Sequence, residues 1–167
     1  MNDLSIVPAT SEDAQKVLTF YSCLLAEHLP YIMDNPAPTL EQEIAFIQRH
    51  DGKRSLLLLA HSGEQVVGMC GYQIAAHQQL SHVCSLGISV HKAFRSQGIG
   101  RRLIAAGEKW CRSRAVYRLE FEVVDGNPAV VFYQRLGFEI EGRKRKAIKV
   151  GDDFRDLIIM AKMFSPK

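Results

Sequence analysis

The sequence predicts one α/β domain, built from a mixed sheet with helices on both faces. Two observations support this prediction. In some segments apolar residues recur every three or four positions, as in helices, whereas in others they alternate or run together, as in strands. Along the 167 residues these segments follow in the order β-α-α-β-β-β-α-β-α-β-β. Strands interleaved with helices form layered folds, and this length suits a single domain.

The first third of the chain is expected to form a strand and two helices. Residues 4–8 form a short strand, and Thr10-Ser11-Glu12-Asp13 is a typical helix start. The helix that follows ends near His28 and carries one apolar stripe: Ala14, Val17, Leu18, Tyr21, Leu24 and Leu25. Three prolines between positions 30 and 38 then interrupt the chain, and a second helix is expected over 40–50.

The middle of the chain changes to strands. Residues 55–62 contain a run of four leucines and are predicted to pair with 65–76 in a hairpin across Ser62-Gly63-Glu64. A third apolar strand spans 83–90. After a glycine-containing loop, a further helix presents one apolar stripe: Ile99, Leu103, Ala106 and Trp110.

The pattern in the last third of the chain predicts three strands, with a helix between the first and the second. Asparagine caps helices and proline suits the first helical position, so Asn127-Pro128 opens this helix and Gly137 ends it. Gly151-Asp152 is typical of a hairpin turn. The strands are expected over residues 118–124, 138–150 and 154–163.

Composition and charge exclude several classes of protein. No apolar run approaches the roughly 18 residues that cross a bilayer, and no signal peptide is visible, so we expect a cytoplasmic protein without membrane contact. A net charge of +3 is too small to indicate nucleic-acid binding by itself. The six histidines lack metal-binding spacing, so no metal site is expected. Four cysteines without a CxxC pair are expected to be reduced core residues: Cys23, Cys70, Cys84 and Cys111.

Two basic clusters stand out. The favoured interpretation of Arg143-Lys144-Arg145-Lys146 is a solvated edge strand, because lysine and arginine there discourage strand-to-strand aggregation. An RNA-binding role is the alternative, although the interleaved aromatic residues that stack on bases are missing. The other cluster, Arg95, Arg101 and Arg102, surrounds two glycines.

These glycines lie in the stretch FRSQGIGRRL, residues 94–103. Backbone amides at a helix start lack partners, and glycine lets a phosphate approach them closely. A Walker loop is excluded by spacing, and a dinucleotide fingerprint is disfavoured because its third glycine is Leu103 here. The pattern that fits is RxxGxG, formed by Arg95, Gly98 and Gly100. By itself it is either a phosphate-binding loop or a turn that opens a helix.

Most of the chain resembles the GNAT acetyltransferase superfamily. Three stretches carry the likeness in order and spacing: SLGISVHKAFRSQGIGRRLI, LEFEVVDGNPAVVFYQRLGFEIEG and GDDFRDLIIMAKM. The last two are most similar to bacterial enzymes that acetylate small substrates or N-terminal amines. The resemblance implies a three-layer fold with a mixed, mostly antiparallel sheet of six to seven strands.

The resemblance also implies acetyl-CoA as the cosubstrate. Its pyrophosphate would lie on the backbone amides of 96–101, with the arginines as electrostatic support, and its pantetheine arm would pair with the strand before the loop. Asn127 would touch the same arm, a role compatible with capping a helix. The implied binding residues are Ile88, Ser89, Val90, Arg95, Ser96, Gln97, Gly98, Ile99, Gly100, Arg101 and Asn127.

For catalysis the resemblance implies direct transfer from acetyl-CoA to an amine within a ternary complex. The tyrosine of the FYxxxGF pattern, Tyr133, would protonate the departing thiolate, although an aromatic residue beside an apolar stripe is also commonly core. Glu122 is the candidate base. Glu120, on the same face of its strand, and a water molecule are the alternatives.

The acceptor is expected between the first-helix loop and the last hairpin, near Tyr31, Ile32 and Met33 and the region 145–154. A free amino acid, a peptide N-terminus or another small amine would fit. A polyamine is disfavoured by the basic run, and antibiotic acetylation or non-catalytic acetyl-CoA binding are alternatives. A homodimer is a further expectation, because dimers are common in this family.

Overall fold

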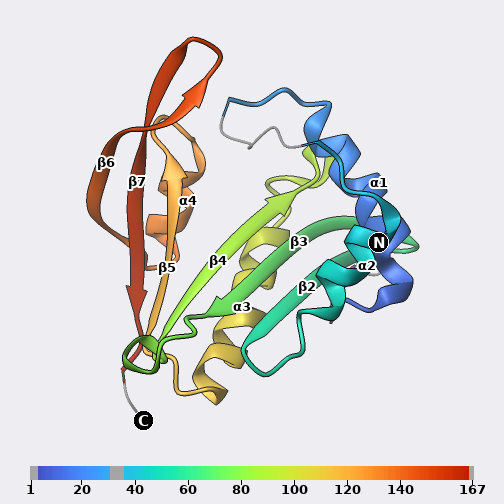
Figure 1. Ribbon diagram of the computed structural model, residues 1–167, viewed down its shortest axis with the longest axis horizontal. Coiled ribbons are helices and arrows are strands. Elements are labelled where there is room, and N and C mark those ends of the chain that lie inside the picture. The colour runs from blue at the N-terminus through green and yellow to red at the C-terminus, as the bar shows by residue number, and fades with distance from the viewer. Residues whose placement is uncertain (1–3, 31–35, 166–167) are drawn as a thin grey trace.

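A computed structural model describes residues 4–30 and 36–165 of the chain. Figure 1 shows a twisted sheet in the order β1-β2-β3-β4-β5-β7-β6. Its strands are β1 (Leu4–Pro8), β2 (Ser55–Ser62), β3 (Gln65–Ile74), β4 (Val83–Val90), β5 (Arg118–Val124), β6 (Glu139–Val150) and β7 (Asp153–Met163). The helices are α1 (Ala14–Leu25), α2 (Leu40–Gln48), α3 (Ile99–Ser113) and α4 (Ala129–Arg135). All neighbouring strands pair antiparallel except β4 and β5, which are parallel.

The predicted mixed sheet and element order are confirmed, but several element ends differ. Helices α1 and α2 end earlier than expected because their last turns tighten: the amides of His28 and His50 donate to carbonyls three residues back. Strand β3 stops at Ile74, two residues early. The predicted start near Thr10 is confirmed, since Asp13 accepts hydrogen bonds of 2.8 and 2.9 Å from the Thr10 amide and hydroxyl.

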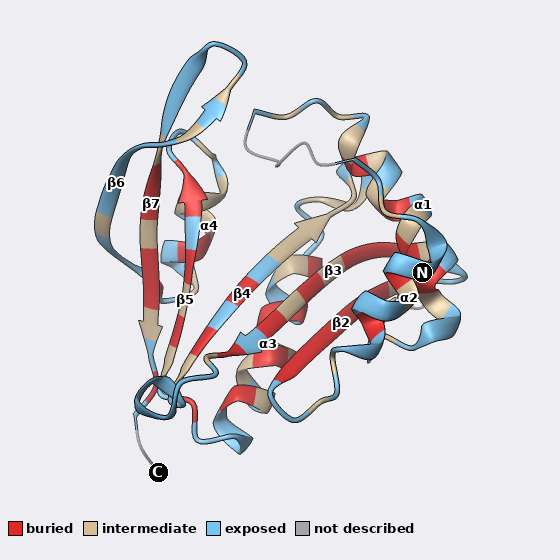
Figure 2. Cartoon of the chain, viewed as in Figure 1, coloured by how far each residue is buried: buried red, intermediate tan, exposed pale blue. Residues whose placement is uncertain are grey.

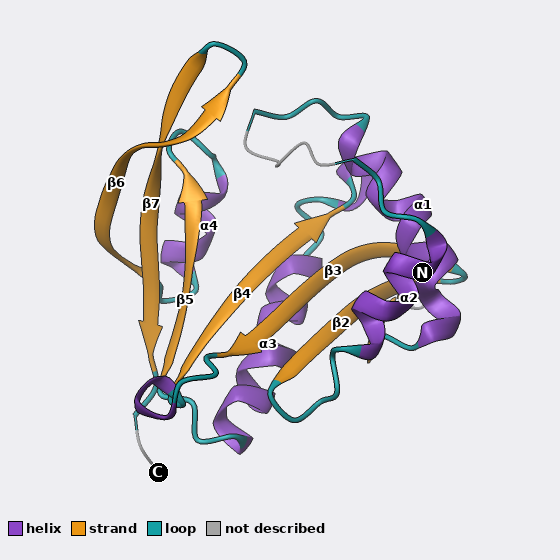
Figure 3. Cartoon of the chain, viewed as in Figure 1, coloured by secondary structure: helices purple, strands orange, loops and turns teal. Residues whose placement is uncertain are grey.

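Helices cover both faces of the sheet, as Figure 3 shows. Helices α3 and α4 pack on one face over the larger core, and α1 and α2 cover β2 and β3 on the other face. Figure 2 shows the resulting contrast between the buried central strands and the exposed outer part of β6. No helix among residues 4–30 and 36–165 is long and apolar enough to span a membrane.

The cysteines only partly match their predicted place in the core. Cys70 and Cys84 of the sheet and Cys111 of α3 are buried in the same core, whereas Cys23 is half-buried, and all four are free thiols. Burial raises the pKa of the Cys70 thiol to about 12, so that thiol stays protonated and unreactive at neutral pH.

Strands β4 and β5 pair over only three residues. Val83, Cys84 and Ser85 lie beside Arg118, Leu119 and Glu120, and the pairing ends there. Beyond that point β4 stays with β3 and β5 stays with β7, so the two strands diverge, as Figure 1 shows. Each therefore presents a free backbone edge towards the other.

Helix α3 lies unusually close to β3 because residue 107 is glycine. A Cβ on Gly107 would come within 1.9 Å of the Tyr72 ring, which is 1% exposed. The Tyr72 hydroxyl donates a 3.2 Å hydrogen bond to the Leu103 carbonyl of the same helix. This contact sets the height of α3 above the sheet, and hence the position of the loop that precedes α3.

We predict that Gly107→Ala destabilises the fold by about 3 kcal/mol, because the added methyl group overlaps a ring that has no room to move. Urea unfolding measures the change. Gly87→Ala is the control, since its new Cβ meets nothing within 4 Å. Adding Tyr72→Leu to Gly107→Ala should restore part of the loss, and a Gly107→Ala protein as stable as wild type would contradict the contact.

Candidate functional site

The candidate site lies where β4 and β5 diverge, and we call this unpaired part of the sheet the opening. On the β4 side the edge without a strand partner runs from Leu86 to Val90, which includes the predicted residues Ile88, Ser89 and Val90, and at its end the Val90 carbonyl accepts from Arg95. On the β5 side it runs from Phe121 to Val124. An extended amide chain can hydrogen-bond to such an edge as an added strand would.

The glycine-containing loop lies at the end of the β4 edge. None of the backbone N–H groups of residues 96–101 donates a hydrogen bond within the described part of the chain. The first helical bond runs from Arg102 N to the Gly98 carbonyl, at 3.0 Å. Six successive free donors at the start of a 15-residue helix form a cradle for an anion such as a diphosphate.

The loop backbone adopts this shape through left-handed conformations. Gly98 has φ of +81°, which glycine reaches without strain, and Ser96 has φ of +60°. Gly100 serves a different purpose, because a Cβ there would lie 3.2 Å from the Phe132 ring of α4. The glycine therefore lets α4 pack against the first turn of α3, beside the free amides.

The arginines around the loop are not equivalent. The Arg95 side chain donates to the Val90 carbonyl at 2.9 Å and to Glu27 at 2.8 Å, so it faces protein groups. Arg102 donates to the Leu4 carbonyl at 2.9 Å. Arg101 is exposed and makes no ion pair with the described residues. Of the two arginines expected to support a phosphate, only Arg101 keeps its charge unpaired.

Tyr133 is buried on α4, with 8% of its surface exposed. Its ring packs edge-on against Phe121 of β5, with centroids 4.5 Å apart. Burial raises the pKa of the Tyr133 phenol to about 12. The hydroxyl makes no hydrogen bond with the described residues, yet it is not among the fully buried unpartnered atoms, so it borders accessible space. This phenol is therefore protonated across the neutral pH range.

Asn127 caps α4, as its sequence position predicted. The side-chain oxygen accepts a 2.9 Å hydrogen bond from the Ala129 amide, and the Asn127 carbonyl accepts one from Val130. The side-chain NH₂ donates to no described residue. A capping asparagine can therefore also donate to a ligand in the opening.

Glu122 and Glu120 lie on the opposite face of β5 from Tyr133. Phe121, between them, points into the core under α4. One carboxylate oxygen of Glu122 pairs with Lys144 of β6, and Glu120 pairs with Arg118 at 2.5 Å. Both carboxylates are a little over one-third exposed. The structure thus places the two carboxylates on one face of β5, while Tyr133 of α4 packs on the other face against Phe121.

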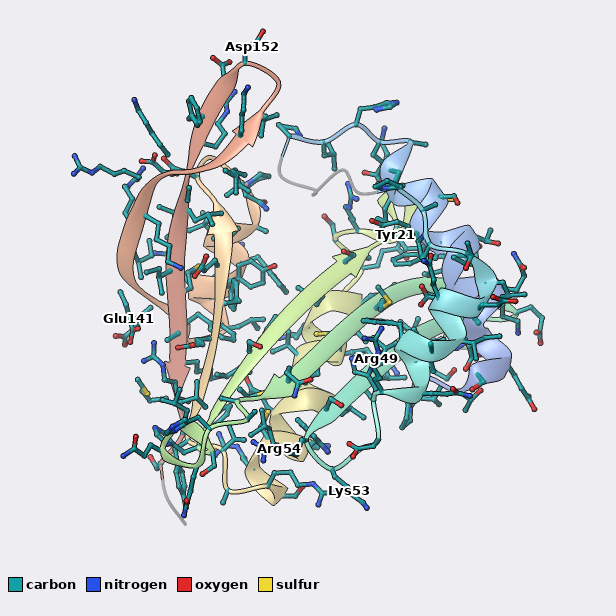
Figure 4. The ribbon with its side chains drawn as sticks, viewed as in Figure 1. Tyr21, Arg49, Lys53, Arg54, Glu141 and Asp152 are labelled. Carbon is teal, nitrogen blue, oxygen red and sulfur yellow. The ribbon has the colours of Figure 1, made fainter. Side chains whose placement is uncertain are left out.

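Much of the basic run on β6 is engaged in ion pairs. Strand β6 is the outer strand of the sheet, as predicted. Arg143 pairs with Asp125 and Asp156, and Lys144 pairs with Glu122. Figure 4 shows Glu141, which pairs with Arg118, at the outer edge, and Asp152 at the tip of the β6–β7 hairpin. Arg145 and Lys146 make no ion pair with the described residues, so part of the basic charge of this strand stays free.

Three contacts at the site were not predicted from the sequence: those of Glu27, Phe132 and Lys144. Phe132 lies in the FYxxxGF pattern and could have been noticed there. Glu27 and Lys144 gave no local signal, because their partners are 68 and 22 residues away. The predicted acceptor residues Tyr31, Ile32 and Met33 lie outside the described residues.

A model of the acetyltransferase (GNAT) family matches residues 20–138. The L-amino acid N-acetyltransferase AaaT of Escherichia coli (strain K12) is 32% identical over 111 residues, which cover 64% of this chain and 67% of AaaT. The family match spans the opening, the loop and α4.

Solved structures agree in fold. A ribosomal-protein-alanine N-acetyltransferase from Brucella melitensis is 26% identical, with a TM-score of 0.86 over 96% of this chain and 99% of that one. YncA from Salmonella typhimurium, a structure with its cofactor acetyl-CoA, is 16% identical, with a TM-score of 0.87 over 99% and 96%. The chain therefore belongs to the GNAT acetyltransferase family and is an acyl-CoA-dependent acetyltransferase.

Proposed function

We propose that this protein transfers the acetyl group of acetyl-CoA directly to the primary amine of a free amino acid, a peptide N-terminus or another small amine. The observation that carries this proposal is the row of six free amides at the end of the open β4 edge. A diphosphate on the amides and an amide-containing arm on the edge match the two parts of coenzyme A in the order in which they occur.

The chain's own groups then take defined roles. Ser96, Gln97, Gly98, Ile99, Gly100 and Arg101 hold the diphosphate through their backbone amides. The edge of Ile88, Ser89 and Val90 aligns the pantetheine arm, and an edge amide polarises the carbonyl that is attacked. When bound, acetyl-CoA supplies an activated thioester, and the Asn127 NH₂ group donates to its arm.

Two protons must move during transfer. The amine nitrogen attacks the thioester carbon, the carbon–sulfur bond breaks, and the sulfur takes a proton from the Tyr133 hydroxyl. The amine loses its proton on the other face of β5, to Glu122 directly or through water, with Glu120 as the alternative. Tyr133 and Glu122 lie on opposite faces of β5, so in this proposal acetyl-CoA and the acceptor amine approach the reacting carbon from different sides.

An α-amine fits this arrangement better than a lysine-like amine. With a pKa near 7.7, an α-amine costs about 0.4 kcal/mol to deprotonate at pH 7.4, against roughly 4 kcal/mol for an amine of pKa about 10.4. Glu122, whose carboxylate already pairs with Lys144, would therefore have to be only a weak base to deprotonate an α-amine. Resemblance to an L-amino acid N-acetyltransferase supports the same class of acceptor.

The alternative functions make different demands on the site. A non-catalytic acetyl-CoA-binding domain would have no use for a reachable Tyr133 hydroxyl. Acetylation of an antibiotic or a polyamine would bring a cationic acceptor towards the basic β6–β7 hairpin. A homodimer and a cytoplasmic location remain predictions.

A thiol-release assay tests the function. Acetyl-CoA is offered with free L-amino acids, short peptides, polyamines and aminoglycosides, and we expect release with an α-amine acceptor. Tyr133→Phe should lower kcat about tenfold or more, because it removes the proton donor, with little change in the Kd of acetyl-CoA. Tyr117→Phe, on an exposed tyrosine outside the site, is the control. Tight acetyl-CoA binding without release from any amine would favour the non-catalytic alternative.

The Tyr133 phenol should stay protonated at pH 10, where an ordinary tyrosine is half ionised. With a pKa of about 12, only about 1% of it is ionised there. The difference in absorbance at 295 nm between wild type and Tyr133→Phe measures this titration, and the same pair in denaturant is the reference. Since ionisation is easier in the unfolded chain, the stability contributed by Tyr133 falls as pH rises from about 10 to 12. A native difference titration centred near 10 would contradict its burial.

If Glu122 is the base, Glu122→Gln should lower kcat/KM at neutral pH by about tenfold and change the acidic limb of its pH profile. Glu141→Gln removes a carboxylate from an ion pair at the outer edge of the same sheet and is the matched control. An unmoved profile excludes Glu122 as the base, and Glu120→Gln then separates Glu120 from a water molecule.

A further inference from the structure

An ion pair connects the end of α1 to the diphosphate-binding loop. One Arg95 nitrogen donates a hydrogen bond to Glu27 Oε1 at 2.8 Å and lies 2.7 Å from Oε2, and Nε donates to the Val90 carbonyl at 2.9 Å. The three groups belong to different parts of the fold: Glu27 follows α1, Val90 ends β4, and Arg95 begins the loop.

The Glu27–Arg95 ion pair is partly shielded from solvent. The Glu27 side chain is 9% exposed, and its Oε2 is buried with no hydrogen bond of its own in the described part of the chain. A carboxylate in such a place is costly unless a cation stays beside it. The Arg95 side chain is 37% exposed, so the pair is buried mainly at Glu27, and the buried carboxylate holds Arg95 beside it.

Holding Arg95 also holds the loop. Between Val90 and α3 the backbone makes a short helical turn, Lys92–Phe94, and then enters the left-handed conformation at Ser96. Arg95 is the residue between these two features, and its side chain returns to the last carbonyl of β4. The free amides of 96–101 are thereby arranged before any ligand arrives, which removes an ordering cost from binding.

We propose that Glu27 is a positioning residue for the diphosphate-binding loop, acting through Arg95. This inference rests on the proposed binding of acetyl-CoA. Arg95 then has a structural role, because its positive charge is paired with Glu27. The diphosphate is recognised by the backbone amides and Arg101. The opposite arrangement, in which Arg95 serves the phosphate and Glu27 restrains it, predicts the opposite result when Glu27 is neutralised.

The test is Glu27→Gln with two acetyl donors. KM for acetyl-CoA should rise about tenfold, while KM for acetyl-pantetheine, which lacks the diphosphate, and kcat with either donor should change less than about twofold. Calorimetry should show the same loss for coenzyme A without any acceptor. Hydrogen exchange of the ligand-free protein should become faster at the hydrogen-bonded amides that flank the loop, those of Phe94, Arg95 and Arg102.

Matched variants separate the explanations. Glu64→Gln removes a charge from another ion pair with α1, Lys16–Glu64, away from the loop, and should change none of these readings. Arg95→Gln should reproduce Glu27→Gln, and the double variant should be no worse than either single one. If Glu27→Gln does not fold, Glu27→Asp, which keeps the charge but reaches less far, must show the same selective loss.

Three outcomes overturn the inference. Tighter coenzyme A binding by Glu27→Gln would mean that Arg95 serves the phosphate. Equal KM changes for both donors would indicate a general structural role. Unchanged binding and exchange would remove any role at the loop. Failure of wild type to bind coenzyme A is a different result, which contradicts the proposed function instead.

Discussion

The site depends on the short parallel pairing of β4 and β5. Only three residues of each strand face one another, and after Ser85 and Glu120 each strand continues with its other neighbour. A sheet paired along its full length would have satisfied these backbone groups and left no opening. Because pairing stops midway, a free edge, a loop and the packed side of α4 lie within reach of one extended ligand.

Around this opening the main chain provides most of the groups that we propose bind acetyl-CoA. The loop offers six free amides, and the nearby Arg95 is already bound to Glu27 and to the Val90 carbonyl. Side chains lie differently, because the alternation of β5 puts Phe121, on which Tyr133 of α4 packs, on one face and Glu122 on the other. The strand therefore lies between the proposed proton donor and the candidate base.

Local features of the site were well predicted from the sequence. The cap at Asn127, the glycines at 98 and 100, and the shared face of Glu120 and Glu122 follow from short-range rules that operate within a few residues. The ends of helices α1 and α2 were predicted less accurately, because both helices tighten over their last turns without a glycine or proline at that point.

The order of elements, the family resemblance and the residues of the glycine-containing loop could all be predicted from the sequence, because each depends on residues a few positions apart. Which charged side chains form ion pairs could be seen only in the tertiary structure. Arg95 meets Glu27 from 68 residues away, and Lys144 meets Glu122 from 22 away. Such pairs depend on which strands become neighbours and where their pairing ends, which no local pattern of residues encodes.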